Sequence, residues 1–132
     1  CEGLARELSS RIPRKAVPVD PRLQEIHFGE WEGQFWSDLE KDETGYFWRW
    51  TVNWKTERPP RALAESAADL EARVRDWFSE YTSEVDGAVL IRHAGPIRVL
   101  RQIADPSITW DDAMARKVPH LRPIYLELCR DG

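Results

Sequence analysis

The sequence predicts an α/β domain in which helices are layered on apolar strands. Residues 88–91 form a continuous apolar run, Ala-Val-Leu-Ile, which is typical of a fully buried strand. Residues 124–128 alternate in period two, which predicts a last strand. Helical patterns precede and separate these two segments, so helices and strands are expected to alternate along the chain.

The N-terminal part begins with an amphipathic helix. Leu4, Leu8 and Ile12 recur at a spacing of four, and Pro13 ends the pattern. The expected elements are, in order, a helix, an extended piece, a structured loop and a short helix, over residues 2–12, 16–19, 22–34 and 35–41. The extended piece leads into the turn signal Asp20-Pro21.

Helical spacing also marks the middle of the chain. Over residues 46–54, Phe47, Trp50 and Trp54 lie at offsets 0, 3 and 7, on one face of a helix. Residues 56–63 form a connector to the clearest helix, over residues 65–82. Its apolar stripe lies at offsets 0, 4, 7, 8 and 11 and consists of Leu70, Val74, Trp77, Phe78 and Tyr81.

Two further helices are expected after the apolar run. Pro96 suits the first position of a helix, which should cover residues 96–104. Thr109, with Asp112 three residues later, predicts another helix start.

The composition limits the classes of function. The chain has 132 residues and a net charge of -4, with eight acids between residues 20 and 43, so it lacks the basic footprint of a nucleic-acid-binding protein. It shows no apolar run long enough to span a membrane, and because no basic region with an apolar stretch is visible at its start, no secretory signal is expected. Cys1 and Cys129 lie at opposite ends without metal-ligand spacing, which suits a reducing cytoplasm.

His93 is the first candidate for chemistry. It follows the apolar run and directly precedes a predicted helix N-terminus, a position where free N–H groups and the helix dipole favour a phosphate. A histidine there can donate a hydrogen bond to a phosphoryl oxygen. A histidine that only ends the strand is the alternative.

Three segments resemble the histidine phosphatase (phosphoglycerate-mutase-like) superfamily. They are Glu25-Ile26-His27-Phe28-Gly29-Glu30-Trp31-Glu32-Gly33, then Pro59-Pro60 with Ala64-Glu65-Ser66, and Val89-Leu90-Ile91-Arg92-His93-Ala94-Gly95-Pro96-Ile97-Arg98. Their order and spacing agree with the family along residues 1–128. Within the superfamily the form is most similar to α-ribazole phosphatases. The resemblance implies a three-layer sandwich with a mostly parallel central sheet flanked by helices.

The resemblance also implies roles for individual residues. Glu25 matches the acid that protonates the leaving oxygen and later activates water. His93 matches the second active-site histidine, which holds the phosphoryl group, and the N–H groups of Ala94 and Gly95 add to that cradle. Trp48 lies off the stripe of its helix and is the candidate for an aromatic lid over the substrate.

The chain departs from the family pattern at its start. The family's nucleophile is a histidine in an Arg-His-Gly segment after the first strand, and no such segment follows Cys1. Because the only methionine is Met114 and the start falls inside a helical pattern, we expect the chain to be a piece of a longer protein. Residues 1–132 are therefore interpreted as one histidine-phosphatase-like domain without its N-terminal strand and nucleophile.

The function expected is hydrolysis of a small phosphorylated metabolite through a phosphohistidine, with α-ribazole phosphate as the preferred substrate. A non-catalytic relative that binds phosphorylated ligands or a partner protein, and a broad-specificity phosphatase or mutase, are the alternatives. No cofactor is expected. No metal is expected either, because His27, His93 and His120 lack ligand spacing. A homodimer is left open.

Overall fold

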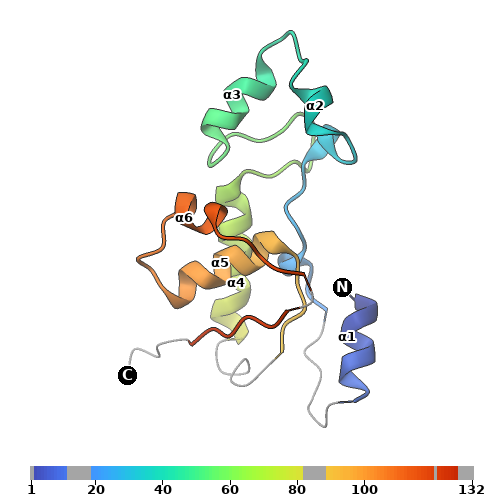
Figure 1. The fold of residues 1–132 in the computed structure, drawn as a ribbon, viewed down its shortest axis with the longest axis vertical. Helices are drawn as coiled ribbons and strands as arrows, with labels where there is room; N and C mark the ends of the chain where they lie inside the picture. The colour runs from blue at the N-terminus through green and yellow to red at the C-terminus, as the bar shows by residue number, and fades with distance from the viewer. Residues whose placement is uncertain (1, 12–18, 82–88, 121, 128–132) are drawn as a thin grey trace. The chain divides into compact units, whose positions relative to one another are not determined.

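The computed structural model describes residues 2–11, 19–81, 89–120 and 122–127 (Figure 1). The elements in order are α1 (Glu2–Ser9), η1 (Pro21–Leu23), η2 (Gly29–Trp31), α2 (Trp36–Leu39), α3 (Tyr46–Asn53), α4 (Ala67–Tyr81), α5 (Ala94–Ala104) and α6 (Trp110–Ala115), where η marks a 3-10 helix. The chain divides into two compact units. Unit 1 comprises residues 1–25 and 73–132, and unit 2 comprises residues 26–72.

The predicted α/β class is wrong for the described residues, which form helices, turns and irregular segments but no strand or sheet. Residues 89–91 form no regular structure, and Val89 is 64% exposed rather than buried. Residues 124–127 are also irregular, and Tyr125 is 89% exposed. Both patterns favour extended backbone, but a strand also needs a neighbour for its hydrogen bonds, and the described residues supply none.

The three-layer sandwich with a mostly parallel central sheet is therefore not formed by the described residues. Parts of three expected extended segments, namely residues 16–18, residue 88 and residue 128, lie outside the described residues. The interpretation of residues 1–132 as a single domain stays a prediction.

The predicted helices are confirmed, with shifted ends. The helices expected over 35–41 and 46–54 are α2 and α3, and the long helix expected over 65–82 is α4. Residue 12 of the first helix and residue 82 of the long one lie outside the described residues. Helix α5 begins at Ala94, two residues earlier than predicted, with Pro96 third. This is allowed because the first N–H groups of a helix have no partner inside it.

Unit 2 is built around aromatic rings. Trp31 meets Trp50 edge to face, with centroids 5.2 Å apart, and meets Phe47 at 5.5 Å. Such pairs each add about 0.5–1.5 kcal/mol to the burial of their area. The buried members of this core are Trp31, Leu39 and Phe47, with Phe28, Tyr46 and Trp50 packed against them.

A close backbone approach fixes the start of η2 in unit 2. Gly29 has φ +58°, and a Cβ there would overlap the carbonyl oxygen of Pro60 and the side chain of Ala64. The N–H of Glu30 donates to that same Pro60 carbonyl at 3.1 Å. Only glycine combines this φ with this contact at no steric cost. Gly29 therefore allows the Gly-x-Trp segment to contact the Pro-Pro segment at this point.

The start of α4 is held by a second set of contacts in unit 2. The N–H of Ser66 donates to the Asp69 carboxylate at 2.8 Å, and the N–H of Asp69 donates to Ser66 Oγ at 3.2 Å. This reciprocal arrangement is a capping box. Arg58 donates two hydrogen bonds to Asp69, at 2.6 and 2.8 Å, and lowers the pKa of that carboxyl.

Unit 1 contains the second part of α4 together with α5 and α6, and the last two helices pack against each other. Its buried apolar side chains include Leu23, Val74, Trp77, Val99, Leu100, Ile108 and Ala113. Helix α6 begins with a capping box between Thr109 and Asp112, as the sequence predicts. Unit 1 also contains both residues predicted to act in catalysis.

Candidate active site at the start of helix α5

The residues around His93 change from extended backbone to helix within one peptide unit. His93 is the N-cap of α5, with φ −78° and ψ 171°, and its carbonyl accepts from the N–H of Ile97 at 3.3 Å. Ala94 and Gly95 are the first two helical residues. The His93 side chain is exposed, and it stands at the helix end that carries unpaired N–H groups and a positive partial charge.

The Glu25 carboxylate lies at this same helix end. The N–H of Gly95 donates to both of its oxygens, at 3.1 and 3.2 Å. Seventy positions separate the two residues, and both belong to unit 1. This contact fixes the Glu25 carboxyl group at the N-terminus of α5. The contact uses the Gly95 N–H, which is one of the donors at the helix N-terminus, where an anionic ligand can also bind.

The backbone that carries Glu25 is held from α4. Arg73 donates from one guanidinium nitrogen to the carbonyls of Arg22 and Gln24, at 2.6 and 2.8 Å. Its other terminal nitrogen donates to the carbonyl of Glu25 at 3.1 Å. One side chain thus binds three carbonyls in a span of four residues.

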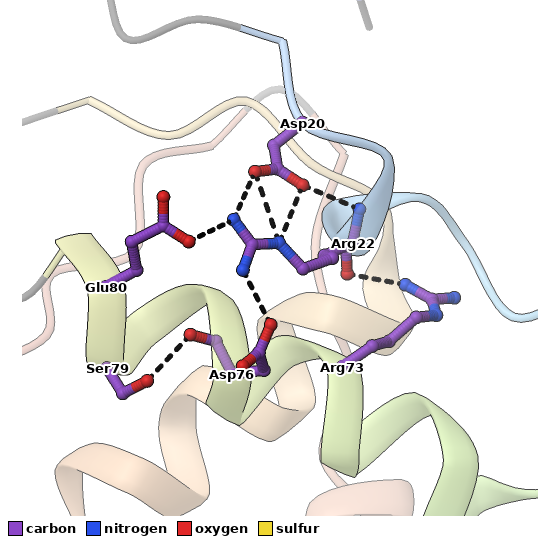
Figure 2. Close-up of polar contacts among 6 residues, drawn as sticks. All are labelled: Asp20, Arg22, Arg73, Asp76, Ser79 and Glu80. Carbon is purple, nitrogen blue, oxygen red and sulfur yellow. Dashed lines mark hydrogen bonds and ion pairs between the residues drawn. The ribbon is translucent and has the colours of Figure 1, made fainter.

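An ion cluster surrounds the neighbouring Arg22 (Figure 2). Its guanidinium lies within 2.7 Å of Asp20, 2.6 Å of Asp76 and 2.8 Å of Glu80. The hydrogen bonds to Arg22 lower the pKa of Asp20, and these carboxylates raise the pKa of Arg22. Figure 2 shows Arg22 between Asp20 and the side chains of α4, while Arg73 reaches the Arg22 carbonyl.

Arg92 places a partly buried cation directly before His93. Burial lowers its pKa, and Asp20 opposes that shift. Its Nε atom is buried and has no hydrogen-bond partner among the described residues. A desolvated guanidinium with an unused donor favours anions nearby. The sequence analysis named Arg92 only as part of the segment that resembles the family.

Three of the predicted catalytic and phosphate-binding residues, Glu25, His93 and Gly95, therefore come together in unit 1, with Ala94 between the last two. Their catalytic roles stay predictions. Trp48, the candidate lid residue, belongs to unit 2, is 54% exposed and packs edge to face on Phe47. Its role also stays a prediction.

Unit 2 contains a hollow of about 190 Å³ beside its aromatic core, lined by Phe28, Trp31, Glu32, Gly33, Gln34, Trp36 and Leu39. Trp48 does not line it. Trp36, which stacks on Trp50 with centroids 5.8 Å apart and is 50% exposed, does. The sequence analysis singled out Trp48 because it lies off the apolar stripe of its helix. That criterion applies within one helix, so it could not show that Trp36, on another helix, lines the hollow instead.

Two positioning contacts escaped the sequence interpretation. Arg73 lies three positions after Leu70, on the same face of α4 as the apolar stripe. A charged residue at that position was the signal in the sequence that Arg73 makes specific contacts. The sequence analysis named Glu65 only as part of the Pro-Pro segment that resembles the family. The Glu65 carboxylate accepts from the N–H of His27 at 3.0 Å, and the Glu65 N–H donates to the His27 carbonyl at 2.9 Å.

Within the described ranges no group of three or more histidine, cysteine, aspartate or glutamate side chains could hold a metal ion. None of the helices described is long and apolar enough to cross a membrane.

Comparison with known proteins places the chain in a family. Residues 2–120 match the histidine phosphatase superfamily (branch 1). "Putative phosphoserine phosphatase 2" of Hydrogenobacter thermophilus (strain DSM 6534 / IAM 12695 / TK-6) is 33% identical over 86 residues, which make up 62% of this chain and 40% of the relative. No solved structure matches significantly. The family match covers most of the chain and includes Glu25 and the His93 segment, so the chain belongs to the histidine phosphatase superfamily.

Proposed function

We propose that the protein containing this chain hydrolyses phosphomonoesters through a phosphohistidine. The observation that carries the proposal is the hydrogen bond between Glu25 and Gly95, which joins a carboxylate to the helix end behind His93. Membership in the superfamily supports this assignment. The nucleophilic histidine would come from a segment before Cys1, because none of the three histidines present stands in an Arg-His-Gly segment.

The reaction divides into two steps. In the first, the nucleophile's nitrogen bonds to phosphorus, the ester P–O bond breaks, and Glu25 gives its proton to the departing oxygen. In the second, Glu25 takes a proton from water, the water oxygen bonds to phosphorus, and the P–N bond breaks. His93 and the first N–H groups of α5 would stabilise the phosphoryl oxygens in both steps.

The substrate class follows from the need for a proton donor. An alkoxide is a poor leaving group, so a carboxylic acid at the leaving oxygen matters most for esters of aliphatic alcohols. We propose that the substrate is a phosphate ester of a small primary alcohol. Phosphoserine is one candidate, because the Hydrogenobacter relative carries that name. α-Ribazole phosphate is the other, because of the Phe-Gly-x-Trp-Glu-Gly form of residues 28–33.

The test uses the complete reading frame that contains these residues. We expect it to encode an Arg-His-Gly segment before Cys1, and the purified protein to release phosphate from phosphoserine or α-ribazole phosphate. A phosphoenzyme that is labile in acid and stable in base should form when the substrate is added. Glu25→Gln should lower kcat/KM by about 10²–10⁴-fold.

A frame without that segment, or a protein inert toward both esters, would contradict the enzyme assignment. Binding of phosphoserine or α-ribazole phosphate without turnover would then select the non-catalytic relative. Equal turnover of many phosphate esters would select a broad-specificity phosphatase.

A further inference from the structure

Apart from Arg73, two kinds of contact within unit 1 hold the segment that ends at Glu25. The Leu23 side chain is buried, with 1% of its surface exposed. The Arg22 side chain is bound by the carboxylates of Asp20, Asp76 and Glu80. Neither contact reaches the peptide group of Glu25 itself.

Arg73 is the side chain on α4 that does reach that peptide group. Its guanidinium donates at 3.1 Å to the carbonyl of Glu25 and at 2.8 Å to that of Gln24. The planar guanidinium presents several donors in fixed directions, so it can bind successive carbonyls at once, whereas an ammonium group is a single point of attachment. Hydrogen bonds from a charged donor are also stronger than those between neutral groups.

We infer that Arg73 is a positioning residue for the proposed reaction: it fixes the backbone of Glu25 so that the carboxylate stays at the N-terminus of α5. This inference rests on the proposed function, in which Glu25 is the proton donor. Arg73 touches neither the substrate nor the reacting atoms in this account. Its contribution passes through the Glu25 main chain to the carboxylate, which Gly95 binds at 3.1 and 3.2 Å.

This role has a kinetic signature that a general loss of stability lacks. A displaced acid slows the transfer of phosphate from an alkyl ester, whose leaving oxygen needs a proton. It has little effect on p-nitrophenyl phosphate, whose leaving group departs as a stable anion. Since kcat/KM reports the first chemical step, the ratio of kcat/KM for the two esters measures how well the acid is placed.

The experiment compares the complete protein with Glu25→Gln, Arg73→Gln and Arg73→Lys variants. The two esters are phosphoserine, or α-ribazole phosphate if that is the better substrate, and p-nitrophenyl phosphate. Arg75→Lys is the matched control, because Arg75 is exposed and lies two residues further along α4. Thermal melting and circular dichroism show whether each variant folds. If Arg73→Gln does not fold, the kinetics of Arg73→Lys alone test the inference.

We expect Glu25→Gln to lower kcat/KM far more for the alkyl ester than for p-nitrophenyl phosphate. Both Arg73 variants should show the same selectivity, with a loss on the order of 10²-fold for the alkyl ester. Arg75→Lys should change neither value. If Glu25→Gln is selective but the Arg73 variants lower both values equally, or lower neither, the inference is overturned and the proposed function stands. A complete wild-type protein that turns over neither ester overturns both.

Discussion

Units 1 and 2 each carry part of the family's sequence pattern, but they hold it by different forces. In unit 2 the Gly-x-Trp segment is fixed by ring packing around Trp31 and by the close approach of Gly29 to Pro60. In unit 1 the segment that ends at Glu25 is fixed by the guanidinium groups of Arg22 and Arg73. Burial of apolar area is insensitive to pH, whereas carboxylate–guanidinium contacts depend on ionisation.

This difference matters for the site. Ring packing gives a rigid support that tolerates little change in volume. Acid weakens the ion pairs of Arg22 with its carboxylates, whereas the hydrogen bonds from Arg73 to main-chain carbonyls do not depend on the ionisation of their acceptors. The proposed catalytic residues Glu25 and His93 both lie in unit 1, where charged side chains bind the segment that ends at Glu25.

The largest effect is expected from Trp31→Ala in the aromatic core. Trp31 is 9% exposed and contacts three rings within 6.0 Å. Its truncation should lower the free energy of unfolding by about 3–5 kcal/mol. Thermal melting measures the loss, and hydrogen exchange should show the greatest loss of protection within residues 26–66. An equal loss of protection within residues 94–115 would show that units 1 and 2 unfold together as one cooperative unit.

Gly29→Ala should have the next largest effect. The left-handed backbone alone costs a non-glycine residue about 1–3 kcal/mol, and the overlap of the new methyl group with Pro60 adds to it. We expect a loss of at least about 2 kcal/mol in chemical denaturation. Gly33→Ala is the control, because Gly33 has φ +74° but open space around its Cβ position. A smaller loss for Gly29→Ala than for Gly33→Ala would contradict the importance of the Pro60 contact.

Acid should weaken unit 1 through Asp20. The folded-state pKa of Asp20 lies below its unfolded value because Arg22 binds the ionised form. The stabilisation is therefore complete above the unfolded value, about 3.9, and is lost as the pH falls toward the folded value. Asp20→Asn should lower the melting temperature at pH 7 and reduce its fall between about pH 5 and pH 3. An unchanged pH dependence would show that this ion cluster contributes nothing.

Trp48→Ala should have the smallest effect on stability, within about 0.5 kcal/mol, because the side chain is 54% exposed. Its predicted role as a lid concerns substrate binding. If Trp48 stacks on an aromatic base, the variant should raise KM for α-ribazole phosphate and leave KM for phosphoserine unchanged. Equal changes for both substrates would contradict that role.

The sequence predicted the helices better than the sheet. Periodicity located α4 because a helix satisfies its own backbone, so its signal lies within one segment. The Thr109–Asp112 box is also local, and it formed as predicted. Residues 89–91 carry an apolar run, but a strand depends on a partner segment that the run does not specify, and none is present among the described residues.

His93 was singled out by its position before a predicted helix, but the pairing of Glu25 with this helix end could be predicted only through the family resemblance. Nothing in the spacing of Glu25 and Gly95 indicates that residues 70 positions apart share a hydrogen bond. Arg73 was accessible to local reasoning, because it interrupts an apolar stripe. A charge on a buried face needs several acceptors, and here the three identified are main-chain carbonyls.

The contact between the Glu25 carboxylate and the Gly95 N–H is the central claim, and amide NMR tests it most directly. In the complete protein labelled with ¹⁵N, the Gly95 amide signal should move as carboxylates are protonated. Glu25→Gln should shift that signal at neutral pH and abolish its movement with acid. A Gly95 signal that neither the substitution nor acid displaces would show that Glu25 does not occupy the start of α5, and the proposed site would lose its proton donor.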